Sequence, residues 1–259
     1  KVHLASIWLV HLGTVFSAFF ILAANSFMQN PVGYTFNEAT NRAELTDFLA
    51  VLTNKVQLVT FPHVLLSAYM TAGAFVLGIG IHHLRRQALD HGPDTGMYRK
   101  ATRFGAWVAL VAALGVVVSG DLQGKVMTEV QPMKMAAAEA LYKTESHAPF
   151  SILSVGDLSG QNATHLIQVP GLLSYLGKGS FDAEIKGIED LSAAAKAKYL
   201  DNPRTADKVT GYVPNIPTTY WTFRLMMGLG FVCMGIAALV LWATRKGATE
   251  GAVKAKWWH

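Results

Sequence analysis

Charged residues and cysteines are both scarce in this chain. Only 15% of its 259 residues carry a formal charge, and Cys233 is the single cysteine. One cysteine excludes an internal disulfide framework and any paired-cysteine metal site. The sequence also has no GxGxxG, no P-loop GK[ST] and no HExxH pattern, which excludes the common nucleotide-binding and zinc-protease motifs. The chain begins at Lys1 and shows no signal-peptide pattern, so we expect an internal piece of a longer polypeptide.

Hydrophobic residues make up 51% of the chain and gather in four long runs. Each run is long enough, at about 1.5 Å of rise per residue, to cross a hydrocarbon layer of roughly 30 Å. A spanning segment must satisfy its own backbone hydrogen bonds, so runs of this length are expected to be helical. The four expected spans are His3–Phe27, Leu58–Ile81, Phe104–Gly120 and Tyr220–Thr244. The predicted fold is therefore all-α, a polytopic membrane helix bundle with four transmembrane helices.

The basic residues indicate how these spans are oriented. The connection after the second span holds five basic residues against two acids, and the tail after the fourth span is also basic (Arg85, Arg86, Arg99, Lys100 and Arg103 against Asp90 and Asp94; Arg245, Lys246, Lys254 and Lys256). The positive-inside rule places both of these regions, and both chain ends, in the cytoplasm. The net charge of +5 is therefore not interpreted as nucleic-acid binding.

The segment from Asp121 to Pro217 lies outside under this topology and is far longer than an ordinary connection. It contains two helical stretches, MKMAAAEALYK and GIEDLSAAAKAKYL, and the apolar stretch HLIQVPGLLSYL, which predicts a partly packed extracytoplasmic subdomain. We expect three parts: residues 1–120 with three transmembrane helices, residues 121–217 as a long extracytoplasmic loop, and residues 218–259 with the last helix and a cytoplasmic tail.

His63 stands near the start of the second apolar run, where an ionisable residue is costly and indicates a functional site. The same helix face carries small residues at helical spacing (Ser67, Thr71, Ala74 and Gly78). Such a face allows two interpretations. It permits close helix packing, with His63 bonded to a neighbouring helix, or it leaves room for a flat macrocycle whose iron is bound by the imidazole.

The fourth run contains Arg224 beside Met226 and Met227. An arginine inside a span needs a carboxylate, water or carbonyl partner, and haem propionates would serve. A thioether can be the second axial ligand of a haem, although most methionines in membrane helices only pack. Arg224 and Met226 are two residues apart, so they point to nearly opposite sides of a helix.

Polar residues elsewhere have weaker interpretations. Lys134 and Glu139 share one expected short helix, where a carboxylate can act as a general base and a lysine can hold an oxyanion; ordinary solvated charges fit the same pattern. His11, Ser17 and Asn25 in the first span can line a proton path or bond to other helices.

Several stretches, in order along the chain, resemble subunit I of the cytochrome bd quinol oxidases. They are ANSFMQNPVG, RAELTDFLAVLTN, FPHVLLSAYMTAGAFVLG, SGDLQGKVMTEVQPMKMAAAEALY and YWTFRLMMGLGF. The fourth stretch resembles the start of that family's quinol-binding loop, and its short form is similar to the actinobacterial branch. The likeness is weakest over residues 143–214.

The resemblance implies roles for particular residues. His63 and Met226 would ligate a low-spin b-type haem, with Arg224 near it. Lys134 and Glu139 would bind and deprotonate quinol. The asparagine and serine of the family's proton path correspond to Asn25 and Ser17.

The resemblance also implies what surrounds the chain. Family members have nine spans. Three of their features have no counterpart in this sequence: the N-terminal histidine that ligates a high-spin haem, the acidic residues of the third helix, and the EYGRQPW segment near the C-terminus, whose glutamate ligates another haem. The chain is therefore expected to be the quinol-oxidising middle of a terminal oxidase that passes electrons to a high-spin b haem and haem d, where oxygen becomes water. Subunit II, small accessory membrane subunits and lipid are the expected partners, in a bacterial inner membrane.

Two other functions are compatible with the residues alone. One is a transporter in which His63 and Arg224 line a substrate path, although such proteins often show repeats and broken helices. The other is a membrane subunit without a cofactor, in which the histidine only packs. Haem content separates both of these from the oxidase.

Overall fold

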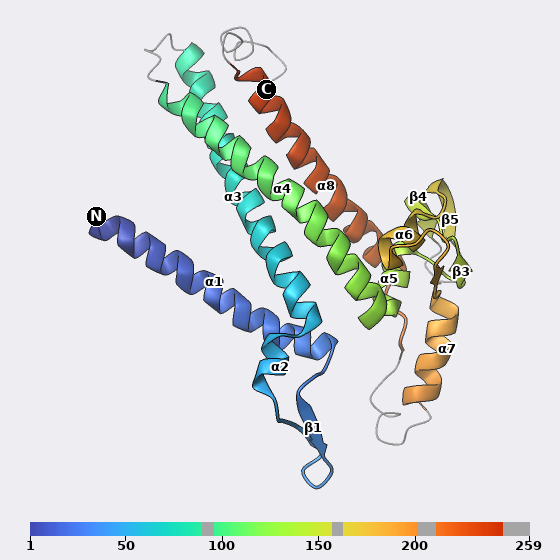
Figure 1. The fold of residues 1–259 in the computed structure, drawn as a ribbon. Coiled ribbons are helices and arrows are strands. Elements are labelled where there is room, and N and C mark those ends of the chain that lie inside the picture. The colour runs from blue at the N-terminus through green and yellow to red at the C-terminus, as the bar shows by residue number, and fades with distance from the viewer. Residues whose placement is uncertain (90–95, 157–162, 201–210, 246–259) are drawn as a thin grey trace. The chain divides into compact units, whose positions relative to one another are not determined.

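The computed structural model describes residues 1–89, 96–156, 163–200 and 211–245 and is mostly helical (Figure 1). Four helices have the length and apolar composition to cross a membrane: α1 (Val2–Gln29), α3 (Lys55–Leu89), α4 (Met97–Val130) and α8 (Ile216–Ala243). The predicted helical fold with four membrane-spanning helices is therefore confirmed. The tail after residue 245, expected to be cytoplasmic, lies outside the described residues.

Two of these helices are longer than their apolar runs. α3 begins at Lys55, which places Pro62 about two turns inside the helix, and α4 continues through the polar residues up to Val130. Arg99 and Arg103, expected in the connection, lie in α4 and donate hydrogen bonds to carbonyl oxygens at the end of α8, to Thr244 at 3.1 Å and to Leu241 at 3.1 Å. These arginines therefore satisfy carbonyls that have no partner within α8 itself.

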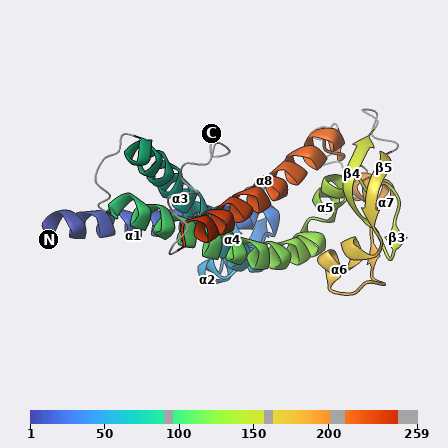
Figure 2. The same ribbon diagram turned by 90° about the horizontal axis from the view of Figure 1, so that it is seen from above.

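The segment between α4 and α8, expected as a long loop, is built from helices and short strands. It contains α5 (Pro132–Glu139), β3 (Glu145–Ser146), β4 (Phe150–Gly156), β5 (Ala163–Val169), α6 (Leu172–Lys178), β6 (Glu184–Ile185) and α7 (Ile188–Tyr199). β4 pairs antiparallel with β5, as Figure 2 shows, and β3 pairs antiparallel with β6. The two helical stretches predicted from sequence correspond to α5 and α7.

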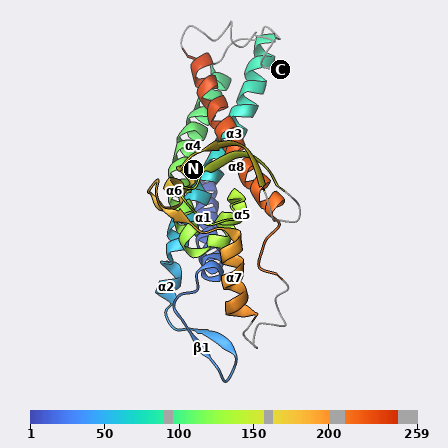
Figure 3. The same cartoon turned by 90° about the vertical axis from the view of Figure 1, so that its right-hand side faces the viewer.

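The first connection is also structured. Strands β1 (Tyr34–Asn37) and β2 (Arg42–Leu45) form a hairpin that precedes the short helix α2 (Phe48–Leu52), as Figure 3 shows. Asp47 caps α2 by accepting a hydrogen bond from the amide of Ala50 at 3.0 Å.

The chain forms two compact units: residues 1–61 with 120–226, and residues 62–119 with the chain from 227 onward. In the first unit, α5, α7 and the start of α8 bury one apolar cluster (Ala136, Ala137, Ala140, Tyr142, Ile188, Ile216 and Tyr220). In the second unit, α3, α4 and α8 lie side by side around another (Leu77, Ala106, Ala109, Ala237 and Val240).

Within the second unit, α3 and α4 approach so closely that glycine is required where they meet. A Cβ atom at Gly73 would lie 2.6 Å from the backbone nitrogen of Ala109, and one at Gly105 would lie 2.5 Å from the nitrogen of Leu77. Real Cβ atoms do not come this close to backbone, so a larger residue must push the helices apart. Small residues at such contacts are a common basis of helix association in membranes.

Replacing Gly73 by valine is expected to destabilise the protein, because the new side chain meets backbone atoms of α4 and cannot be accommodated by side-chain movement. The effect should be a lower apparent unfolding temperature in detergent, measured by thermal unfolding. Gly235→Ala in α8 is the matched control, since a Cβ there has nothing within 4 Å and alanine favours helix. Equal unfolding temperatures for the two variants would contradict the close approach.

Candidate functional site

His63 in α3 is held in one orientation by Ser119 in α4. The ring nitrogen Nδ1 lies 3.1 Å from the Ser119 hydroxyl oxygen. When that hydroxyl donates its single hydrogen to the carbonyl of Gly115 at 2.8 Å, Nδ1 of His63 is the donor in the bond between the two side chains. The other nitrogen, Nε2, then carries a free lone pair. This is the tautomer and the supporting bond expected for an imidazole that ligates a metal.

The small-residue face that continues from His63 is not the face that packs against α4. Gly73 and Leu77 make the close contacts, whereas a Cβ at Gly78 would have nothing within 4 Å. Ser67 and Thr71 turn their hydroxyls back to carbonyls of α3, at 2.8 Å and 2.9 Å. His63 is bonded to a neighbouring helix, as the packing interpretation expects, and the haem interpretation of this face stays a prediction.

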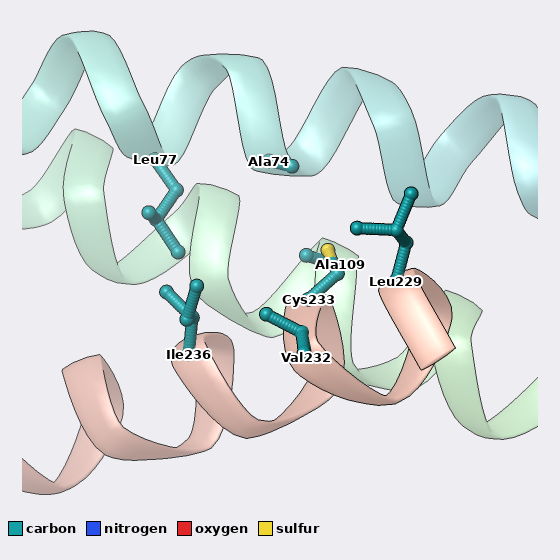
Figure 4. A pocket seen from close by; sticks show the side chains of 7 residues that line it. All are labelled: Ala74, Leu77, Ala109, Leu229, Val232, Cys233 and Ile236. Carbon is teal, nitrogen blue, oxygen red and sulfur yellow. The ribbon is translucent and has the colours of Figure 1, made fainter. Parts of the chain in front are cut away.

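An apolar pocket opens along the same part of the second unit. Figure 4 shows Leu229 and Ile236 of α8 pointing toward α3, with Ala74 and Leu77 on the opposite side. The complete lining is Ala74, Leu77, Ala109, Leu229, Val232, Cys233 and Ile236. The chemistry of this pocket suits the edge of an apolar group and offers no charge to a polar solute.

Met226 in α8 exposes 53% of its surface. A thioether with this exposure is not packed into the core, so its sulfur remains available as a ligand. An imidazole and a thioether are the donor types of a His/Met-ligated haem, and the pairing of His63 with Met226 stays a prediction. Arg224, two residues earlier, points to another side of α8, as the helical spacing predicts.

Arg224 forms a buried ion pair with Glu139 of α5. Nη2 of Arg224 lies 2.5 Å from Oε2 of Glu139, and Nη1 donates to Oε1 at 3.1 Å. The two side chains are only 8% and 2% exposed. The guanidinium also lies over the rings of Phe150, at 4.4 Å, and Tyr220, at 4.6 Å. The sequence predicted a partner for Arg224, and the structure provides a carboxylate.

The surroundings of Glu139 bring its proton affinity into the physiological range. Burial of the carboxyl raises its pKa to about 7, and the hydrogen bond and positive charge of Arg224 oppose that rise. A carboxyl with this pKa exchanges its proton near neutral pH, as a general base must.

A line of hydroxyls leads away from this ion pair, and no pattern in the sequence predicted it. The Tyr220 hydroxyl lies 3.1 Å from the hydroxyl of Ser151, which is hydrogen-bonded to that of Ser154. The Ser154 hydroxyl lies 2.5 Å from Nδ1 of His165 on β5. Tyr220, Ser151 and Ser154 are all buried, whereas His165 is half-exposed.

Lys134 lies on a different side of α5 from Glu139. Five residues separate them, which is about 7.5 Å along the helix and about 140° around it. Lys134 is exposed and lines a recess where α1, α3 and α4 of the first unit meet α5. Besides Lys134, the recess is lined by apolar side chains and by amides and a hydroxyl (Val56, Val59, Val126, Met127 and Val130; Gln29, Thr60, Gln123 and Gln131).

Ser17 and Asn25 both lie on the exposed surface of α1. The amide oxygen of Asn25 accepts a hydrogen bond from Gln29 at 2.6 Å. The structure thus places them on one helix, about 80° apart around its axis, and their role in a proton path stays a prediction.

Comparison with known proteins identifies relatives over the whole chain. The family model described as cytochrome bd terminal oxidase subunit I matches residues 1–259. The cytochrome bd ubiquinol oxidase subunit 1 of Bacillus subtilis is 36% identical over 259 residues, which is 100% of this chain and 52% of that protein. The cytochrome bd-II ubiquinol oxidase subunit 1 of Escherichia coli is 24% identical, over 96% of this chain and 57% of that protein.

A solved structure gives the same result for the fold. The bd oxidase from Geobacillus thermodenitrificans matches with a TM-score of 0.72 and 24% identity, covering 93% of this chain and 52% of that one. The chain thus spans about half the length of the relatives that it matches.

Proposed function

Because the chain belongs to the cytochrome bd terminal oxidase subunit I family, we propose that it forms the quinol-oxidising part of such a subunit. In this proposal it works in a bacterial cell membrane beside subunit II, and it passes electrons from quinol towards a high-spin b haem and haem d that reduce oxygen. Translocation of charge then follows from proton release outside and proton uptake inside. The oriented imidazole of His63 is the observation that carries the proposal, because a packing histidine does not need a free Nε2 on an open helix face.

His63 and Met226 would hold the low-spin b haem. When bound, this group would supply a one-electron acceptor for the electrons of quinol. Ser119 keeps the His63 ring from rotating and keeps its proton on Nδ1, which directs the lone pair of Nε2 outward.

Lys134 and the amides around its recess would bind the quinol headgroup. A hydroquinone has hydroxyls on a flat apolar ring, which matches a recess with valine walls and polar groups at its rim. Glu139 would accept the proton. Since its carboxyl is enclosed with Arg224 on another side of α5, the proposal includes a rotation of the carboxyl out of the ion pair when quinol binds.

The proposal is tested by following quinol oxidation in the complete oxidase from about pH 5 to about pH 9. Below the pKa of Glu139, about 7, the carboxyl is protonated and cannot accept a proton; above it, the base is available. The rate is therefore expected to rise through neutral pH in the wild type.

Glu139→Gln keeps the shape of the side chain and cannot be deprotonated, so its rate should be low and independent of pH over this range. Glu184→Gln is the matched control, since Glu184 is an exposed carboxylate on β6 that belongs neither to the recess nor to the ion pair. A wild-type protein that contains haem but does not oxidise quinol would overturn the proposed function.

A further inference from the structure

We propose that the hydroxyls of Tyr220, Ser151 and Ser154, together with the imidazole of His165, form the route by which protons from quinol leave the protein. This inference rests on the proposed function and deepens it, because it assigns an exit to protons that Glu139 accepts. None of the four residues belongs to the quinol or haem site described above.

The route is a continuous series of hydrogen bonds through buried groups. It runs from the Tyr220 hydroxyl to Ser151 at 3.1 Å, from Ser151 to Ser154, and from Ser154 to Nδ1 of His165 at 2.5 Å. A hydroxyl both donates and accepts, so each one can receive a proton on one side as it gives one up on the other. The series begins beside the Arg224–Glu139 pair and ends at a half-exposed ring.

A β-bulge in β4 creates this alignment. Residues three apart in a regular strand point to opposite faces, so Ser151 and Ser154 should not face the same side. The pairing of β4 with β5 shifts register between Ser151 and Leu153 and again between Leu153 and Ser154. Both serines are consequently buried while Ile152 between them is exposed. Bulges often redirect side chains at functional sites.

Arg224 supplies the reason for a proton to leave Glu139. Its guanidinium binds the carboxylate and also donates through Nε to the carbonyl of Ser151 at 2.7 Å, the same carbonyl that the Tyr220 hydroxyl meets at 3.2 Å. A protonated carboxyl that returns to this fixed positive charge is driven to lose its proton. The carboxyl of Glu139 and the phenol of Tyr220 both lie beside the guanidinium of Arg224. In the proposed route a bridging water carries the proton from this carboxyl to the phenol hydroxyl.

His165 is suited to the exit. Burial lowers the pKa of its imidazole, with the negative charge of Glu145 opposing that shift, so the ring is neutral at physiological pH and Nδ1 can accept a proton. The half-exposed ring then rotates and releases the proton on Nδ1 to the outer water, while Nε2 keeps its own proton. The return rotation places an unprotonated Nδ1 beside the Ser154 hydroxyl again.

The proton and electron counts balance. Oxidation of one quinol to quinone releases two electrons and two protons, and the electrons go one at a time to the haem acceptor of the proposed function. Each proton passes from the quinol oxygen to Glu139, then along the hydroxyls to His165 and into water. Glu139 is ionised again after each transfer, so the route needs no further reactant.

The test uses the complete oxidase with Tyr220→Phe, Ser154→Ala and His165→Ala, each of which interrupts the route at a different point. Each change is expected to lower kcat for quinol oxidation on the order of tenfold, with unchanged KM and a larger solvent deuterium isotope effect. Added imidazole should restore His165→Ala and leave Ser154→Ala slow. Combining Tyr220→Phe with His165→Ala should cost no more than either alone, because both act in one series.

Ser146→Ala and Gln168→Ala, exposed positions in the same segment, serve as controls. Measurements of haem content and thermal unfolding identify any variant that fails to fold. His165 is half-exposed, so His165→Ala disturbs packing least and still tests the route if a variant at a buried position does not fold. If the wild type turns over and all three variants match the controls in kcat and isotope effect, the relay is wrong and the proposed function stands. If wild-type protein with bound haem does not oxidise quinol, the proposed function fails first.

Discussion

Replacing His63 by alanine is expected to abolish the low-spin b-haem signal and, with it, quinol oxidation. In the proposed haem site the imidazole of His63, bonded to Ser119, would be the iron ligand, and alanine provides nothing in its place. Loss of an axial ligand leaves the remaining thioether too weak to hold the iron in a low-spin state. The measurement is a dithionite-reduced minus air-oxidised absorption spectrum of the intact purified oxidase, with oxygen uptake recorded on the same sample.

His82→Ala is the matched control, because His82 lies on the same helix, exposed, about five turns beyond His63. The control should keep both the spectrum and the activity. A low-spin signal that survives His63→Ala unchanged would move the ligand to another residue. Ser119→Ala should have an intermediate effect. The haem should still bind but be lost more readily, because the His63 ring loses its hydrogen bond to Ser119 and keeps the nitrogen that would bind iron.

Breaking the Arg224–Glu139 pair is expected to give the second large effect. Glu139→Leu leaves a buried guanidinium without a counter-charge and should cost about 3–5 kcal/mol of stability. Arg224→Leu should cost less, about 1–3 kcal/mol, because a buried carboxyl can bind a proton and become neutral, whereas a guanidinium stays charged. Thermal unfolding of the complete oxidase in detergent measures the order of the two variants.

The double variant Glu139→Leu/Arg224→Leu should recover most of the lost stability, since two apolar side chains replace a pair that is 2% and 8% exposed. It should nevertheless remain inactive in quinol oxidation. Equal losses for both single variants, with no recovery in the double variant, would show that the pair contributes through packing alone. Lys125→Leu, which breaks a partly exposed pair with Asp121, should cost far less.

Apolar runs predicted the membrane helices because a spanning segment must be both apolar and helical. The same signal stops where charges begin, so it missed the extensions of α3 back to Lys55 and of α4 on to Val130. It also could not show that the segment between α4 and α8 folds into short helices and strands. In its described residues β3 pairs with β6 and β4 pairs with β5, and periodicity in a single sequence does not reveal which strands pair.

For the candidate site, too, the sequence predicted some residues and only the fold shows the others. An imidazole inside an apolar run identified His63, and an arginine in a span indicated that Arg224 needs a partner. The partners themselves, Ser119 and Glu139, are 56 and 85 residues away in sequence, and only the fold brings them close. The line of hydroxyls through Ser151 and Ser154 depends on a bulge, which no alternating pattern predicts.

The glycines between α3 and α4 have an effect on chemistry as well as on packing. His63 and Ser119 stand on different helices, so the 3.1 Å hydrogen bond between them depends on how those two helices are spaced. The glycines at 73 and 105, where α3 and α4 meet, contribute to that spacing, and in the proposed haem site the bond to Nδ1 would influence how much electron density Nε2 offers to iron. Residues ten and more positions from the ligand, with no side chain of their own, would in this way tune a reduction potential.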